Sequence, residues 1–197
     1  MTVLSQHTSD ANSERAFASL RRRFPRWEQV VKVAVEEVAE AIRAGGLANQ
    51  KAPRLQAILA EVERREGRLS LARLRCLDDD EALAYLCSLP GVGPKTAACV
   101  LLFSLGRAAF PVDTHVHRLA LRLGWVVPGT SAEAAQRVLT PRVPSELRYE
   151  LHSLLIAHGR TVCSARSPRC SDCVLLDLCP TGTELLAREP VATRGSK

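Results

Sequence analysis

The sequence predicts an all-α fold. Apolar residues recur with a helical period along most of the 197-residue chain, and almost no stretch alternates apolar and polar residues as a strand does. Glycine and proline separate the periodic stretches, as helix stops and turns should. Hydrophobic residues make up 46% of the chain, which is enough to bury a core in one domain or two small lobes and excludes wholesale disorder.

The helices follow one another in chain order, each bounded by residues that end helices. They are predicted at residues 11–23, 27–44, 53–66, 79–88, 94–106, 114–124, 131–139 and 145–159. The stops between them are Gly45, Gly46, Gly67, Pro90, Gly91, Gly106, Pro111, Gly124, Pro128 and Gly129. The last stretch, 181–197, is polar and contains Pro190 and Gly195, so we expect a disordered tail there.

One predicted helix, 94–106, is apolar around nearly its whole circumference, so we expect it to run through the centre of the molecule. Its polar residues Lys95 and Thr96 lie in the first turn. The positive end of the helix dipole and low water content would both disfavour an ammonium group at Lys95. A neutral amine, which a nucleophile requires, is therefore favoured at this position.

The charge balance favours a polyanionic partner. Lysine and arginine number 27 against 21 aspartates and glutamates, which gives a net charge of +6 and a pI near 9.2. No uncharged apolar stretch is long enough to cross a membrane, and the N-terminus lacks the pattern of a secretory signal. We therefore expect an intracellular, cytoplasmic protein without a membrane partner.

The seven cysteines fall into two groups. Cys76, Cys87 and Cys99 lie singly in apolar surroundings and are expected to be small buried hydrophobes. The other four lie within 17 residues in the spacing C-x6-C-x2-C-x5-C, and they are Cys163, Cys170, Cys173 and Cys179. Disulfides are kept reduced inside cells, so this group predicts a metal site. Four thiolates suit zinc as well as an iron-sulfur cluster, although zinc ribbons more often use two close CxxC pairs with a longer spacer.

A glycine hairpin precedes the apolar helix, with the sequence LPGVGPKTA over residues 89–97. Two glycines spaced by one residue allow tight backbone conformations that expose N–H groups at a helix N-terminus, where a phosphate oxygen can bind. A short GxG alone would be an ordinary turn between helices. The complete string, however, resembles the helix-hairpin-helix motif of the endonuclease III superfamily of DNA glycosylases. That resemblance implies that Lys95 is the catalytic nucleophile and that Gly91, Val92, Gly93 and Thr96 contact DNA.

A second string, VDTHVHR over residues 112–118, follows at a distance that suits one helix and a return loop. Asp113 is placed to cap a helix, which is the ordinary role of such an aspartate. The string also resembles the second signature of the same family, and this implies that Asp113 is the catalytic carboxylate. In the LPGVGPKTA string, Lys95 stands where other branches of the family carry serine or tyrosine. Its presence argues against those branches.

The cysteine spacing resembles the [4Fe-4S] loop of endonuclease III and related adenine glycosylases, with His158-Gly159-Arg160 ahead of it as in that family. The resemblance implies a [4Fe-4S] cluster held by the four clustered cysteines. Because the loop is short and basic, with Arg166 and Arg169, we expect the cluster to brace a DNA-contacting loop rather than to catalyse.

Two further segments resemble DNA contacts of the family. Residues 5–10 match the start of its second helix, where one residue fills the gap that a flipped base leaves; His7 falls at that position, with Gln6 as the alternative. The stretch from Ile42 to Ala52, which includes Lys51, looks like a second backbone-contacting turn. The chain begins midway through the family's second helix, so exposed apolar surface is expected.

The resemblance covers nearly the whole chain and implies a two-lobed helical fold. Residues 1–112 would form a barrel lobe with the helix-hairpin-helix at 82–106, and 113–180 a cluster lobe with its loop at 163–179. The implied function is a monomeric DNA N-glycosylase and AP lyase acting on double-stranded DNA with oxidised or ring-saturated pyrimidines or an abasic site. A noncatalytic DNA-binding or DNA-scanning iron-sulfur protein, and an AP lyase with little glycosylase activity, are the alternatives.

Overall fold

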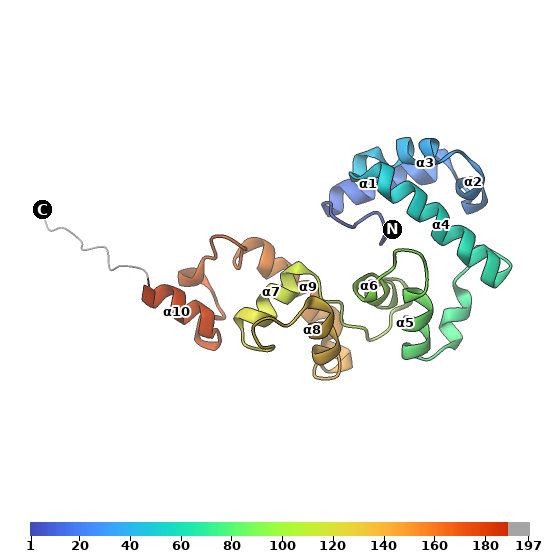
Figure 1. The fold of residues 1–197 in the computed structure, drawn as a ribbon. Helices are drawn as coiled ribbons and strands as arrows, with labels where there is room; N and C mark the ends of the chain where they lie inside the picture. Colours follow the sequence, from blue (N-terminus) through green and yellow to red (C-terminus); the bar gives the residue numbers. More distant parts are fainter. Residues whose placement is uncertain (189–197) are drawn as a thin grey trace, which may run out of the picture. The chain divides into compact units, whose positions relative to one another are not determined.

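The computed structural model describes residues 1–188 and confirms the all-α fold: helices and short 3-10 turns account for the regular structure of this part of the chain (Figure 1). The α-helices of the described residues are α1 (Asp10–Arg23), α2 (Trp27–Lys32), α3 (Val35–Ala41), α4 (Ala48–Glu66), α5 (Asp79–Cys87), α6 (Pro94–Leu105), α7 (Thr114–Arg122), α8 (Ala132–Leu139), α9 (Arg148–Thr161) and α10 (Pro180–Arg188). None of these helices has the length and hydropathy needed to span a bilayer.

The chain divides into two compact units, Met1–Arg107 and a second that begins at Ala108. Arg107 is tied to the first unit because its guanidinium donates to three carbonyl oxygens between η2 (Ala72–Cys76) and the start of α5. The carbonyl of Ala108, by contrast, accepts from Arg148 of α9. The division therefore falls at 107/108, whereas the sequence placed it at 112/113.

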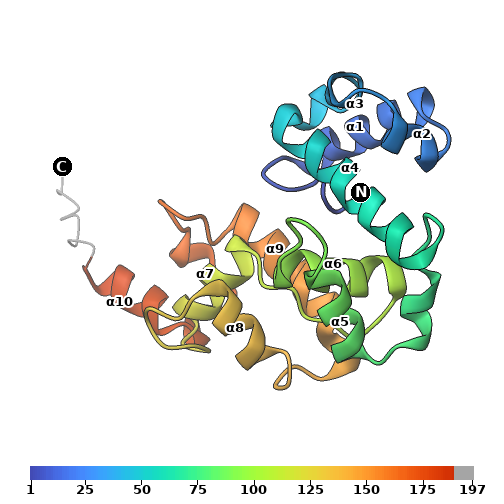
Figure 2. The same cartoon turned by 45° about the vertical axis from the view of Figure 1, so that its right-hand side comes forward.

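The first unit is built from α1 to α6. Helices α1, α3 and α4 enclose one core, whose fully buried side chains include Leu20, Val38 and Ile42 (Figure 1). Helices α5 and α6 pack against each other and are joined by a tight loop (Figure 2). Two arginines of α4 reach this loop: Arg65 donates to Ser88, and Arg54 lies against Gly91.

The prediction of one helix over 27–44 is wrong, because the chain breaks between α2 and α3. The amide nitrogen of Gln56 in α4 donates to the carbonyl oxygens of Val30 and Val33, each at 2.8 Å. These bonds satisfy carbonyls that the end of α2 leaves without a helical partner. Apolar periodicity continues across the break, so the sequence pattern does not reveal it.

Helix α6 is less enclosed than its composition suggests. The stretch from Thr96 to Cys99 is buried, with Ala97 fully covered, and Ala98, Leu101 and Leu102 are at 5% exposure or less. Phe103, however, is 50% exposed. The expectation of a helix buried all round therefore holds for one face of α6 and not for the face that carries Phe103.

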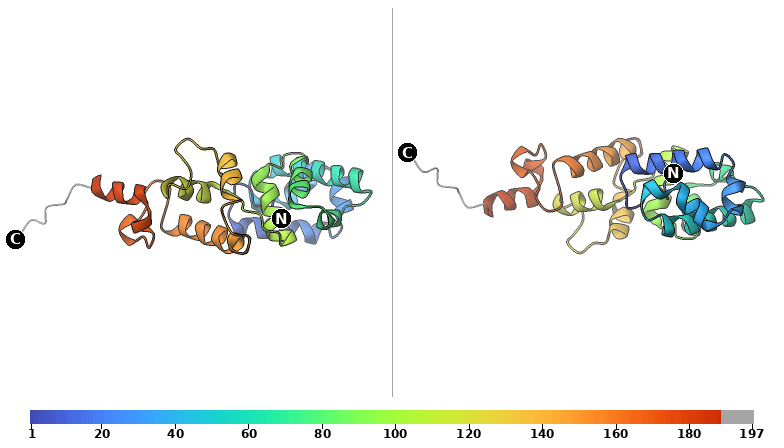
Figure 3. Two further views of the ribbon diagram at one scale, coloured as in Figure 1. Left: turned by 90° about the horizontal axis from the view of Figure 1, so that it is seen from below. Right: turned by 90° about the horizontal axis from the view of Figure 1, so that it is seen from above.

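In the second unit, α7 packs against α8 and α9 (Figure 3). The core contains Phe110, Val116 and Leu119, and the buried ring of His152 hydrogen-bonds the carbonyl of Pro111 through Nδ1 at 2.9 Å. Residues 181–188, predicted within a disordered tail, are helical as part of α10, which packs on the 3-10 turns of the cysteine loop. The rest of that predicted tail lies outside the described residues.

Candidate active site and cysteine cluster

The glycine hairpin between α5 and α6 is anchored by two apolar side chains and exposed at its glycines. Leu89 and Val92 are 4% and 8% exposed, and the Val92 N–H donates to the Leu89 carbonyl at 3.1 Å, so Val92 shapes the turn. Gly91 has a φ of 69°, which residues with a Cβ adopt only with strain. Gly93 caps α6, and a Cβ built there meets nothing within 4 Å. An incoming group thus has room beside the unpaired N–H groups of the first turn of α6.

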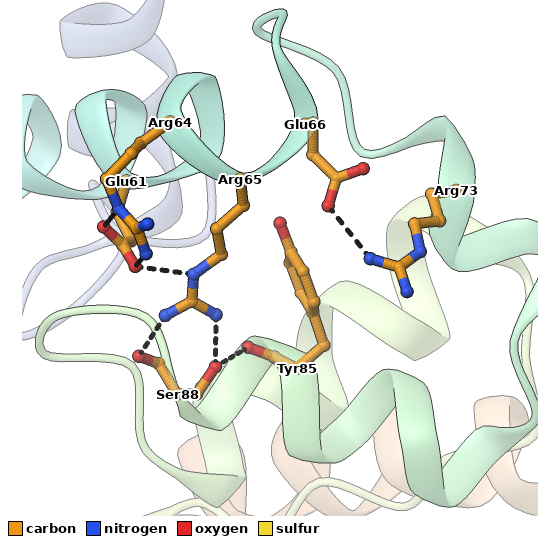
Figure 4. A network of polar contacts seen from close by, with 7 residues as sticks. All are labelled: Glu61, Arg64, Arg65, Glu66, Arg73, Tyr85 and Ser88. Atoms are coloured by element: carbon orange, nitrogen blue, oxygen red, sulfur yellow. Dashed lines mark hydrogen bonds and ion pairs between the residues drawn. The ribbon is translucent and has the colours of Figure 1, made fainter.

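An arginine of α4 holds the base of this hairpin (Figure 4). Arg65 donates through Nη1 to Ser88 Oγ at 2.6 Å and through Nη2 to the Ser88 carbonyl at 3.2 Å, and its guanidinium lies 5.4 Å from the centre of the Tyr85 ring. Ser88 is the residue that ends α5. Glu61 orients Arg65 through a 2.6 Å bond to Nε, and its hydrogen bonds with Arg64 and Arg65 lower the pKa of Glu61 to about 2.

Lys95 follows Pro94 in the first turn of α6, as the sequence predicts, but its side chain is exposed. Of the two effects expected at this lysine, low water content is therefore absent from the structure of the free chain. The helix dipole remains, because Lys95 is at the N-terminal end of a 12-residue helix. The amine is accessible to a substrate that reaches the hairpin.

Asp113 caps α7, which confirms the capping role predicted from the sequence. Its Oδ1 accepts from the backbone N–H groups of His115 at 2.9 Å and Val116 at 2.8 Å. The two bonds hold the carboxylate in a fixed position at the start of α7. Both bonds use one oxygen, which leaves Oδ2 for other partners. Asp113 belongs to the second unit and Lys95 to the first.

The two candidate residues in the N-terminal segment have different surroundings. His7 is exposed and has a φ of 53°, in the left-handed region. Gln6 is half-buried and hydrogen-bonds inward, with Nε2 donating to Thr96 Oγ1 at 3.0 Å and Oε1 accepting from Arg54 Nη1 at 3.0 Å. Thr96 itself is 7% exposed. Gln6 and Thr96 therefore bind each other, and His7 is the side chain that the segment presents to solvent.

Lys51 is buried at 3% exposure rather than displayed on the surface. Its ammonium donates to the carbonyl oxygens of Leu4 and Gly45, each at 2.8 Å. Burial lowers the pKa of Lys51, while the two carbonyls compensate the buried charge. The Lys51 side chain therefore holds the turn before α4 to the N-terminal segment. The contact of this turn with DNA stays a prediction.

The four clustered cysteines line one cavity in the second unit, between α7, the end of α9 and the start of α10. Among the described residues, no three histidine, cysteine or acidic side chains converge closely enough to hold a single metal ion. Four thiols that line one cavity are a donor set for an iron-sulfur cluster or for zinc.

Two hydrogen-bond donors contact sulfur atoms of this cavity. Arg122 Nη1 lies 3.0 Å from Cys163 Sγ, and the Gly182 N–H at the start of α10 donates to Cys179 Sγ at 3.3 Å. Burial, followed by the neighbouring thiols, raises the pKa of Cys170.

The comparison with known families decides the class of protein. Residues 1–144 match the HhH-GPD superfamily of base excision DNA repair proteins. The chain belongs to this superfamily. Residues 163–179 match the iron-sulfur binding domain of endonuclease III, and this range begins and ends at the outer two of the four cysteines.

Individual relatives agree with this assignment. Endonuclease III of Thermotoga maritima is 35% identical over 179 residues, covering 90% of this chain and 79% of that protein. The Arabidopsis thaliana protein named "Putative DNA glycosylase At3g47830" is 43% identical over 162 residues, 82% of this chain, and the chain spans 55% of its length. A trapped covalent intermediate of endonuclease III with DNA matches with a TM-score of 0.81 and 33% identity, covering 93% of this chain and 82% of that one.

Sequence reasoning missed the arginines that support the HhH-GPD site. Arg54, Arg65 and Arg122 contact the hairpin or the cysteine loop from helices distant in sequence. Arg54 and Arg65 are 11 residues apart, which places them on one face of α4 because 11 residues are close to three helical turns. That spacing was the one feature of the sequence that could have pointed to this role. Exposed arginines are common on helices, however, and the sequence does not show which groups they bind.

Proposed function

We propose that this chain is a bifunctional DNA N-glycosylase and AP lyase of base excision repair. The observation that carries the proposal is the accessible amine of Lys95 on the first turn of α6, directly after the glycine hairpin. Membership of a DNA repair superfamily and likeness to an endonuclease III trapped covalently on DNA support it.

In the proposed reaction the lone pair of Lys95 Nζ attacks C1′ of the damaged nucleotide. The bond from C1′ to the base breaks, and its electron pair leaves with the base, which takes up a proton. The attached amine then loses a proton, and its lone pair forms the C=N bond as the C1′–O4′ bond breaks. O4′ leaves with that bond's electron pair and takes up a proton, so the sugar ring opens to a Schiff base. A proton is then removed from C2′ and the 3′ phosphate departs, so the strand is nicked by β-elimination; water finally releases the enzyme from the imine.

Asp113 is assigned to charge stabilisation in this reaction. Positive charge develops on the sugar as the base leaves, and a fixed carboxylate stabilises it more in the transition state than in the ground state. The cap bonds to Oδ1 hold the carboxylate in place, and Oδ2 remains to face substrate. Capping and catalysis are therefore compatible in one side chain.

The hairpin is assigned to the DNA backbone. Gly91 and Gly93 are exposed and lie before the unpaired N–H groups of α6, an arrangement that binds a phosphate oxygen. Such contacts position DNA without reading its sequence, and the net charge of +6 adds salt-dependent affinity. We take oxidised or ring-saturated pyrimidines as substrates, on the resemblance to endonuclease III.

The four cysteines are proposed to hold a [4Fe-4S] cluster whose chemistry is structural. Coordination would fasten the loop over 163–179 to α7 through Arg122 and to α10 through Gly182. The exposed Arg166 and Arg169 of that loop would then meet DNA from a fixed backbone.

Replacing Cys170 by serine should remove most of the iron and acid-labile sulfide and the broad visible absorption of the protein purified without oxygen. Thermal unfolding of the second unit should begin at a lower temperature, because the loop has little apolar core of its own. Cys76→Ser is the matched control, since Cys76 is an exposed cysteine in the first unit. Stoichiometric zinc and no iron in the parent protein would contradict the cluster.

Three duplexes test the activity itself: one with thymine glycol, one with an abasic site and one undamaged. The proposal predicts excision and nicking of the first, nicking of the second, and borohydride-trapped covalent complexes with both. Binding to all three without trapping would instead indicate a noncatalytic DNA-binding protein. Nicking confined to the abasic duplex would indicate an AP lyase with little glycosylase activity.

A further inference from the structure

The segment before α1 holds His7 in a strained backbone conformation. A φ of 53° is costly for a residue with a Cβ and persists only where neighbouring residues impose it. On the C-terminal side, Ser9 caps α1 by accepting from the Asn12 N–H at 3.3 Å. On the N-terminal side, Leu4 is 1% exposed and its carbonyl accepts from Lys51. Between these anchors lies Gln6, directly before His7; its N–H donates to the Val3 carbonyl at 3.4 Å, and its side chain reaches two helices.

Gln6 is held by two helices at once. Arginine only donates hydrogen bonds, so the amide oxygen of Gln6 must face Arg54 of α4, and this leaves the amide nitrogen for the hydroxyl of Thr96 in α6. Both bonds are 3.0 Å long. The amide of Gln6 is thereby engaged at both ends, and its orientation is determined.

Arg54 contacts the hairpin as well as Gln6. A Cβ built on Gly91 would lie 2.6 Å from Arg54 Nε and 2.8 Å from Cδ, so the arginine side chain lies directly across the glycine. One guanidinium therefore joins the N-terminal segment, through Gln6, to the tip of the hairpin. Thr96, the other partner of Gln6, is next to Lys95 in the first turn of α6.

We infer that Arg54 and Gln6 are positioning residues, which hold the exposed His7, the hairpin glycine Gly91 and the turn of α6 that carries Lys95 in one fixed arrangement. The planar guanidinium suits this role because it presents donors in fixed directions, whereas a lysine ammonium is a mobile point charge. Gln6, predicted as a DNA contact, is assigned instead to orienting its neighbour. The inference rests on the proposed function in one respect: DNA is taken as the ligand that these residues contact.

Hydrogen exchange of the DNA-free protein tests the arrangement without any assay of activity. The variants are Gln6→Ala, Arg54→Lys and the double variant, with Arg64→Lys as the control because Arg64 is another exposed arginine of α4. If Arg54 and Gln6 form this brace, the amides of residues 5–9 should exchange faster in all three variants but not in the control. The expected increase is about fivefold, the effect of losing one hydrogen bond of ordinary strength. Unchanged exchange in Gln6→Ala and Arg54→Lys would overturn the inference, whether or not the protein is an enzyme.

Single-turnover excision of thymine glycol then tests what the brace does for the reaction. Each single variant should slow excision about fivefold, and the double variant should be no slower than either, because the same contact is lost in all three. Affinity for undamaged duplex should stay within about twofold, since Arg54→Lys keeps the charge that sets nonspecific binding. Additive losses, or an Arg54→Lys protein as fast as the parent, would show that Arg54 acts as a charge and would overturn the positioning role. Inactivity of the parent would count against the proposed function. The exchange experiment would then decide by itself whether Arg54 and Gln6 fix residues 5–9.

Discussion

Lys95→Gln should abolish both the borohydride-trapped complex and strand nicking while leaving DNA binding close to that of the parent. The amine is the only group in the proposed reaction that can form the Schiff base, and glutamine has no comparable nucleophile. Lys95 is exposed, so its replacement leaves no buried partner unsatisfied and the free energy of unfolding should hardly change. The measurements are trapping on an abasic duplex, nicking, and affinity by fluorescence anisotropy.

Lys32→Gln is the matched control, because Lys32 is also exposed and also near the end of a helix. It removes the same charge and should trap and nick like the parent. Trapping that persists in Lys95→Gln would refute the assignment of the nucleophile. A large loss of affinity without loss of trapping would assign Lys95 to DNA binding.

Asp113→Asn should reduce thymine glycol excision by about a thousandfold, as expected when a preorganised charge in an active site is removed. Asparagine caps helices about as well as aspartate, so α7 should keep its start and the protein its fold. An abasic duplex should be affected less, because no base has to leave and less positive charge develops on its sugar. Rates of excision and of nicking are measured separately under single-turnover conditions.

Asp78→Asn separates catalysis from capping. Asp78 caps α5 and accepts from the Glu81 N–H at 2.7 Å, so this variant makes the same chemical change at another helix N-terminus. It should excise thymine glycol like the parent. Equal losses in both variants, or equal losses of Asp113→Asn on the two substrates, would assign Asp113 to the fold alone.

The sequence predicted the helices well where apolar periodicity and a punctuating residue agree. Helix α6 begins at Pro94 and ends before Gly106, as expected of both residues. The break between α2 and α3 escaped prediction because Gln56, far along the chain, stabilises it. Helix α10 escaped because its packing against the cysteine loop, rather than its own polar sequence, supports it.

For the candidate site, the sequence located chemical groups better than their environments. Asp113 was placed as a cap from its position before a periodic stretch, and the structure has it there. Lys95, in contrast, was expected in surroundings with little water because its helix is apolar. Its side chain is exposed, because the first turn of the helix projects beyond the core. Burial of Lys51 and the brace through Arg54 depend on carbonyl and amide partners that no local pattern encodes.

Mapping the residue in the trapped complex tests the central claim most directly. After borohydride reduction on an abasic duplex, nuclease and protease digestion leave the sugar remnant on one peptide, which mass spectrometry identifies. The account predicts the remnant on Lys95, in the peptide that spans the glycine hairpin and α6. A remnant on Lys32, Lys51 or Lys197, or on the N-terminal amine, would contradict it.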